Sequence, residues 1–336
     1  MKKIFLVSLL GVFVFFSKAA AHVGYVLTEE EFIANSGEDA LYVLKALSSQ
    51  ITINITLSII LAVVLIAFIY RKSIFLKSWA GRVVDRLKTY DEFLPWAIRL
   101  SLGIALIGAG TAQVLVSPIQ VATSSVAFLE ILLGFFFMAG FLLIPATLLT
   151  IGLYIFGLSG NFYLLGNLDF LALAIAFLAL HNERPGFDDI FNFKILHSLK
   201  IKRSLASPIL RLGIGGAMMF LALYEKILNP HLSELVVNNF HLTSVIPVDP
   251  SLWVVGSGIV EFVIGLMLIL GLFTRLSSII AFGVLSLSFF FFKEAVYSHI
   301  TLFGLLSILF VLGGGVWSLD SIIFGKKSPS VEAPNL

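Results

Sequence analysis

Residues 251–272 read SLWVVGSGIVEFVIGLMLILGL, and Glu261 near the middle is the one charged residue among them. A helix needs about 20 consecutive apolar residues to cross the hydrocarbon core of a bilayer. The segment therefore predicts a transmembrane helix. A charge near its centre is costly in lipid, so Glu261 is expected to face other helices and to be neutral or paired.

Eight more apolar runs lie along the chain and are separated by turn residues and charges. With the first run they predict helices at about 51–70, 95–116, 123–143, 145–158, 163–181, 208–228, 251–272, 275–292 and 298–317. The composition agrees, because only 12% of the residues are charged, about half the share of a soluble domain. We expect an all-α, polytopic membrane protein that contacts lipid.

Residues 1–21 have the pattern of a secretory signal peptide. Two lysines precede an apolar run too short to cross a bilayer, and three alanines at 19–21 form the expected cleavage site. The mature chain is then expected to begin at His22, with residues 22–50 outside the cytoplasm. An uncleaved anchor is the alternative, because Lys18 lies close to the cleavage site.

Lysine and arginine are concentrated in residues 71–94 and 182–207 and recur in the tail at 322–336. Cytoplasmic loops of membrane proteins carry such an excess. The two segments are therefore expected to be cytoplasmic linkers of a plasma-membrane protein whose C-terminus also lies inside. The net charge of +2 is too small to indicate binding to nucleic acid.

Several kinds of chemistry are absent from the sequence. The chain has no cysteine, which excludes disulfides, thiol redox motifs and cysteine-ligated iron–sulfur clusters. It also lacks a phosphate-binding loop, an HExxH motif, a GxSxG motif and a dinucleotide-binding fingerprint. The predicted helices place no two histidines where they could share one haem iron, so we expect no metal site.

Residues 95–181 and 208–321 look like two diverged copies of one four-helix unit. The same residue types recur in the same order: Arg99, Gly103, Glu130, Gly134 and Gly140 in the first, and Arg211, Gly215, Glu261, Gly265 and Gly271 in the second. The second copy has an insertion near residues 229–250. Four helices per copy make the copies parallel. The pattern predicts two four-helix bundles side by side after the helix at 51–70, with a site where they meet.

The second copy resembles the DoxX family of small four-helix membrane proteins. The resemblance rests on Arg211, Gly213, Lys226, Glu261, Gly265, the run Gly271-Leu-Phe-Thr274-Arg275 and the closing run Gly313-Gly-Gly-Val-Trp-Ser318-Leu319-Asp320. The first copy is similar more weakly, since it lacks the lysine, the Thr-Arg pair and the closing run. The resemblance implies a membrane component of an oxidoreductase complex, which in some relatives acts on quinones.

The candidate site consists of ionisable residues of the second copy. Glu261 is the best candidate for a catalytic group, either in a proton relay or as a hydrogen-bond partner of a quinone; a purely structural clamp is the alternative. The candidate residues for a polar, quinone-binding pocket are Glu225, Lys226, Arg211, Arg275 and His299. The two arginines also lie near predicted helix ends, where their side chains could instead reach the membrane surface. A slot for the quinone is expected between helices 208–228 and 251–272, beside Tyr224 and Trp253.

Three functions remain open from the sequence. The first is a membrane subunit of an oxidoreductase complex that contacts quinone and a protein partner. The second is a carrier for a small solute, which predicts a polar cavity between the copies. The third is a scaffold without chemistry, whose buried polar groups are all paired internally.

Overall fold

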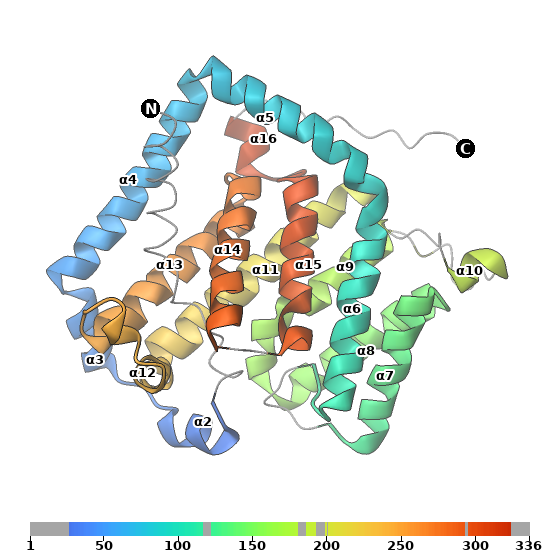
Figure 1. Cartoon of the computed structure of the whole chain (residues 1–336), viewed down its shortest axis with the longest axis horizontal. Helices are drawn as coiled ribbons and strands as arrows, with labels where there is room; N and C mark the ends of the chain where they lie inside the picture. Colours follow the sequence, from blue (N-terminus) through green and yellow to red (C-terminus); the bar gives the residue numbers. More distant parts are fainter. Residues whose placement is uncertain are drawn as a thin grey trace.

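The computed structural model describes residues 27–116, 122–180, 186–192, 199, 201–292 and 295–323. These residues form a helical assembly in which α4 and α5 run along two sides of the remaining helices (Figure 1). The expected signal peptide and the C-terminal end of the tail lie outside the described residues.

The part of the chain before residue 94 contains more helix than we expected. Its elements are α2 (Glu29–Asn35), α3 (Ala40–Leu47), α4 (Gln50–Lys72), α5 (Ile74–Leu87) and the 3-10 helix η2 (Lys88–Phe93). Helix α4 is the predicted span at 51–70, and α2 and α3 precede it. The basic segment 71–94, which we expected to be a linker, is largely helical.

The remaining helices follow the predicted apolar runs with shifted ends. They are α6 (Leu94–Thr111), α7 (Ser124–Ala139), α8 (Leu143–Gly160), α9 (Leu168–Leu180), α11 (Ala206–Leu223), α13 (Pro250–Leu270), α14 (Thr274–Phe292) and α15 (Val296–Leu312). Shorter elements join them: η3 (Phe162–Asn167), α10 (Phe187–Ile190), η4 (Arg203–Leu205), the π-helical turn η5 (Tyr224–Leu228), α12 (Pro230–Asn239), η6 (Leu242–Ser244) and α16 (Leu319–Ile323).

Six helical segments of the described chain are long and apolar enough to cross a membrane. They are Gln50–Lys72, Ile74–Thr111, Leu143–Gly160, Phe162–Leu180, Arg203–Leu228 and Pro250–Leu270. Three shorter apolar helices, α7, α15 and the first part of α14, occupy the other predicted runs. The prediction of an all-α, polytopic membrane protein is confirmed, whereas the length criterion supports six spans rather than nine.

After residue 94, helices of the first half pack against helices of the second half. Helix α6 packs along α7 and α15, and α11 packs along α13 and α9. Figure 1 shows α6 and α15 side by side. The first helix of each half therefore lies against the last helix of the other half. Two separate four-helix bundles are not confirmed, because much of the burial occurs across the two halves.

Helices α11 and α13 approach each other so closely that their backbones touch. A Cβ atom added at Gly215 would lie 2.6 Å from the carbonyl oxygen of Gly265, and one added at Gly265 would lie 2.8 Å from that of Gly215. Only glycine allows this approach, which replaces hydrophobic attraction as the basis of helix association in lipid. Gly103 and Gly134 make the equivalent contact between α6 and α7.

Arg211 closes the end of the bundle near α16. Its Nη1 donates to the carbonyl of Ile269 at 3.1 Å, and its Nη2 donates to the carbonyls of Val316 and Trp317 at 3.0 and 3.1 Å. The residue is 2% exposed. The expectation that it reaches the membrane surface is wrong, because the last carbonyls of a helix need donors and the guanidinium supplies them.

Arg275 does the same for the end of α15. Its Nε donates to the carbonyl of Phe310 at 3.0 Å, and its Nη2 donates to the carbonyls of Val311 and Leu312. Arg275 is partly buried. It therefore ties α14 to α15 through the last carbonyls of α15.

An aspartate caps the second helix of each of two helix hairpins, α7–α8 and α13–α14. Asp320 accepts from the backbone N–H groups of Phe273 and Thr274 at the start of α14. Asp188 accepts in the same way from Leu142 and Leu143 at the start of α8. These carboxylates satisfy helix N-termini that would otherwise lack acceptors. Asp188 lies in the segment that we expected to be a basic linker.

The opposite end of the molecule carries α2, α3 and α12 (Figure 1). The insertion near 229–250 contains α12, whose His231 bridges two acidic residues. Its Nε2 lies 3.1 Å from Asp39 of α3, and its Nδ1 lies 2.9 Å from Glu234. A small second core lies beneath this bridge and includes Leu232, Val236 and Trp253.

Replacing Arg211 by methionine should lower the stability of the protein strongly. The change leaves three carbonyls without this donor, and an acceptor left unsatisfied away from water costs about 1–3 kcal/mol. Arg203→Met is the matched control, since Arg203 pairs with Asp91 on the surface, where an ion pair is worth about 0–1 kcal/mol. Thermal unfolding in mild detergent measures both variants. Equal unfolding temperatures for the two would contradict the assigned role of Arg211.

The bridge between α3 and α12 should depend on pH. The hydrogen bond with Glu234, followed by that with Asp39, raises the pKa of His231 above its ordinary 6.5. The backbone N–H of Tyr42, followed by His231, lowers the pKa of Asp39 below 3.8. The stability from His231 is therefore complete below about pH 6.5 and is lost as the pH rises through the raised pKa. The stability from Asp39 is present above about pH 3.8 and is lost as the pH falls through the lowered pKa.

Hydrogen exchange tests this dependence when it is corrected for the intrinsic effect of pH. Protection of α3 and α12 should fall as the pH rises from mildly acidic to alkaline values. His231→Gln should remove the dependence, and His241→Gln, an exposed histidine of the same insertion, should keep it. A wild-type profile in the His231 variant would refute the bridge as its source.

Candidate functional site

The last turn of α11 is a π-helical turn that carries Glu225 and Lys226. The backbone N–H of Asn229 donates to the carbonyl of Tyr224, five residues earlier, at 2.9 Å. Glu225 is 0% exposed and Lys226 is 3% exposed, so both neighbouring side chains are buried. Such π turns are rare and are found preferentially at functional sites.

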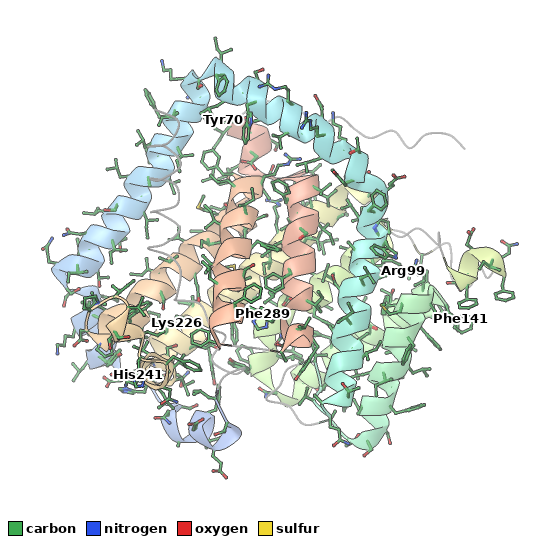
Figure 2. All side chains as sticks on the ribbon, viewed as in Figure 1. Tyr70, Arg99, Phe141, Lys226, His241 and Phe289 are labelled. Atoms are coloured by element: carbon green, nitrogen blue, oxygen red, sulfur yellow. The ribbon has the colours of Figure 1, made fainter. Side chains whose placement is uncertain are left out.

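Lys226 connects two buried carboxylates. Its Nζ lies 2.8 Å from Oε2 of Glu261 and 3.5 Å from Oε2 of Glu225. The expected position of Glu261, buried and within reach of a cation on a neighbouring helix, is confirmed. Of the candidate partners, Lys226 makes this contact, while Arg211 and Arg275 bind carbonyls at the other end. Figure 2 shows Lys226 at the end of the bundle that carries α12 and His241.

Tyr163 extends this cluster into the first half of the molecule. Its hydroxyl donates to Oε1 of Glu225 in a short hydrogen bond, and the residue is 4% exposed. Tyr163 belongs to η3, where Asn161 caps the turn by accepting from the backbone N–H of Tyr163 at 3.0 Å. Four titratable side chains from η3, η5 and α13 thus form one buried chain, which we call the Tyr163–Glu261 cluster: Tyr163, Glu225, Lys226 and Glu261.

Sequence reasoning did not single out Tyr163. A signal was present, since Tyr163 begins the predicted helix 163–181 and Glu225 lies near the end of the predicted helix 208–228, which places both at the same side of the membrane. Contacts between the two halves were needed to recognise the pair. The sequence of a single helix does not show these contacts.

An aromatic wall lies beside the Tyr163–Glu261 cluster. The ring centroid of Tyr163 lies 5.4 Å from that of Tyr224, and the rings of Tyr224 and Phe220 stack at 5.5 Å. Phe162 packs edge-on against Phe220 and is 66% exposed. The wall therefore extends from the buried cluster to the surface of the helical bundle, on the face formed by η3 and α11.

Tyr224 and Trp253, which were expected to flank the slot, contact other elements. Tyr224 faces η3 rather than α13, and the indole N–H of Trp253 donates to the carbonyl of Ile246 in the second core. Where Gly215 meets Gly265, α11 and α13 leave no room for a ring.

The other predicted pocket residues do not join the cluster. Arg211 precedes Glu225 on the same helix by about 21 Å, at about 1.5 Å per residue, and Arg275 lies at the same end as Arg211. His299 is 1% exposed, its Nδ1 lies 3.0 Å from the hydroxyl of Ser298, and its ring packs against Phe289 and Phe303. Of the five proposed pocket residues, the structure brings Glu225 and Lys226 to Glu261.

The first half has a different arrangement at the corresponding place. Glu130 is 0% exposed and accepts from the backbone N–H of Val116 at 3.2 Å. Its second oxygen has no hydrogen-bond partner among the described residues. A cavity of about 10 Å³ lies nearby, and Val116, Asn167 and Thr301 contribute to its lining. That volume is about enough for one water molecule.

Replacing Lys226 should destabilise the protein, because the cluster depends on the lysine ammonium. Lys226→Met leaves Glu225 and Glu261 buried without the ammonium, and breaking a buried pair costs about 3–5 kcal/mol. Glu261→Gln should cost less, since the amide keeps the shape and a hydrogen bond. The double variant Lys226→Met/Glu261→Gln should be more stable than Lys226→Met alone. Thermal unfolding of the three variants gives the coupling, and additive losses would show that Lys226 and Glu261 do not interact.

Comparison with known proteins gives a family match in the second half of the molecule. Residues 207–294 match the family model described as DoxX. No curated protein and no solved structure gave a significant match. The matched region begins within α11 and contains Glu225, Lys226 and Glu261, and it confirms the resemblance of the second half. The similarity to DoxX proteins thus covers residues 207–294 of a helical membrane protein.

Proposed function

We propose that this protein is a membrane subunit of an oxidoreductase complex and that the Tyr163–Glu261 cluster exchanges protons with a quinone. The observation that carries the proposal is the buried chain of four titratable side chains, which lies beside an aromatic wall that extends to the surface. Buried ionisable groups inside a membrane protein are costly and most often serve proton or substrate transfer.

The residues of the cluster fit a quinone headgroup. Reduction of a quinone to a quinol takes up protons, and the Tyr163 hydroxyl and the Lys226 ammonium are suitable donors. Glu225 and Glu261 accept hydrogen bonds from these donors and can return a proton to them. The rings of Phe220, Tyr224 and Tyr163 offer the flat apolar surface that a quinone ring needs.

The electrons would come from a partner protein. The chain contains no cysteine with which to hold an iron–sulfur cluster, so we assign the redox centre to another subunit of the complex. The proposed orientation places the cluster near the outer side of the plasma membrane and the basic α5 end in the cytoplasm. The lysine and arginine excess of the segments around α5 and η4 supports this orientation.

We further propose that the two halves are copies of one unit. The turns after α7 and α13 have the same left-handed backbone, with φ of 70° at Gly140 and 64° at Gly271, and φ of 49° at both Leu142 and Phe273. The backbone N–H of an aspartate donates to each glycine carbonyl at 2.9 Å: Asp188 to Gly140 and Asp320 to Gly271. In such a duplication the second copy keeps the ionisable cluster, while Gln113 and Val114 occupy the corresponding positions of the first.

A scaffold without chemistry is the second candidate. It is favoured by one observation, that Lys226, Glu225, Tyr163 and Glu261 are partners of one another, as in a structural clamp. The carrier alternative gains no support from the cavity near Asn167, since that cavity has room for about one water molecule.

Binding of decylubiquinone to the purified protein separates the two candidates. Tyr163→Phe keeps the ring and removes the hydroxyl, and Glu261→Gln removes the charge. Each should weaken binding about tenfold, because a lost hydrogen bond of about 1.4 kcal/mol changes the dissociation constant by that factor. Gln113→Ala in the first half is the control and should bind like the wild type.

The complex itself is tested by mass spectrometry of proteins that copurify in mild detergent. A cofactor-bearing redox protein should be among them. Absence of quinone binding by the parent protein, or unchanged binding by both cluster variants, would refute the quinone site and leave the scaffold candidate ahead.

A further inference from the structure

Helix α5 follows α4 after a sharp bend (Figure 1). Ser73 ends α4 and begins α5, and its hydroxyl accepts from the backbone N–H of Leu76 at 3.2 Å. None of the residues of α5 is fully buried. The helix therefore lies on the surface of the assembly and leads through η2 into α6.

One face of α5 lies against the protein. Apart from Gly81, the half-buried residues are Leu76, Ala80, Val83, Val84 and Leu87. Their spacing of three and four residues places them on one side of a helix. This side includes the contact of α5 with α15, so the remaining sides face the surroundings.

An exposed flank of α5 combines aromatic and basic side chains. Phe75, Trp79, Arg82 and Arg86 follow one another at intervals of four, three and four residues and share one flank. Phe75 is 71% exposed and Trp79 is 53% exposed. The opposite flank carries Lys77 and Lys88, of which Lys88 pairs with Asp85 at 2.8 Å.

We propose that the flank formed by Phe75, Trp79, Arg82 and Arg86 lies in the headgroup layer of the bilayer and binds the phosphates of anionic lipids. Helix α4 supports this position, since apolar side chains such as Leu61 and Phe68 are 67% and 58% exposed along it. Its last residues are Arg71 and Lys72. Helix α5 thus begins where the hydrocarbon-facing part of α4 ends.

The chemistry of the flank matches this layer. Tryptophan concentrates at membrane interfaces, and amphipathic helices with aromatic and basic residues lie in the interface plane. Arginine binds phosphate through two parallel N–H groups. Each basic residue near an anionic membrane surface strengthens attachment about fivefold.

Fluorescence of Trp79 tests the position. In a variant in which Trp96, Trp253 and Trp317 are replaced by phenylalanine, Trp79 is the remaining tryptophan. Reconstituted in vesicles of phosphatidylcholine and phosphatidylglycerol, it should be quenched by lipids brominated near the headgroup and protected from iodide. Free quenching by iodide with no effect of brominated lipid would overturn the proposal and indicate a water-facing surface for a protein partner.

Retention of lipid tests the binding with a charge-matched control on the opposite flank. Arg82→Gln/Arg86→Gln should lower the ratio of phosphatidylglycerol to phosphatidylcholine that the detergent-purified chain retains about tenfold, as measured by native mass spectrometry. Lys77→Gln/Lys88→Gln removes the same charge from the opposite flank and should change the ratio less than twofold. Equal losses in the two variants, or no loss in either, would overturn the assignment to this flank.

Discussion

The hydrogen bonds from Arg211 to backbone carbonyls determine how the end of the bundle near α16 is closed. In an apolar surrounding, carbonyls at the end of a helix have no water to bind and must find donors within the protein. Arg211 supplies donors to the end of α13 and to the segment after α15, and Arg275 supplies them to α15. The ends of α13 and α15 and the segment after α15 thus depend on two guanidinium groups, which α11 and α14 carry.

Helix α11 joins this closed end to the Tyr163–Glu261 cluster. Between them the glycine contact with α13 keeps the two backbones together, so that Glu261 meets Lys226 at the other end. A shift of α11 along α13 would separate the ammonium from its carboxylate in an environment where neither can be left unpaired at low cost. Packing in the middle of the helix and charge pairing at its end therefore favour the same register.

The Tyr163–Glu261 cluster contains residues of both halves because helices of the two halves pack against each other. Because α11 packs along α9, the element η3 that precedes α9 brings Tyr163 to Glu225. Neither half alone contains all four residues of the cluster. The geometry of the cluster therefore depends on the relative position of the two halves.

Composition and hydropathy determined from the sequence that this is an all-α membrane protein, and the order of Arg211, Lys226 and Glu261 indicated the DoxX family. The burial of Glu261 also followed from the sequence, because the cost of a charge in lipid requires it. Only the tertiary structure showed that Arg211 donates to backbone carbonyls, that Lys226 rather than Arg211 pairs with Glu261, and that Tyr163 completes the cluster. The physical reason is that hydropathy indicates only whether a helix lies in lipid or in water. The partner of a buried charge depends on which helices pack together and in which register.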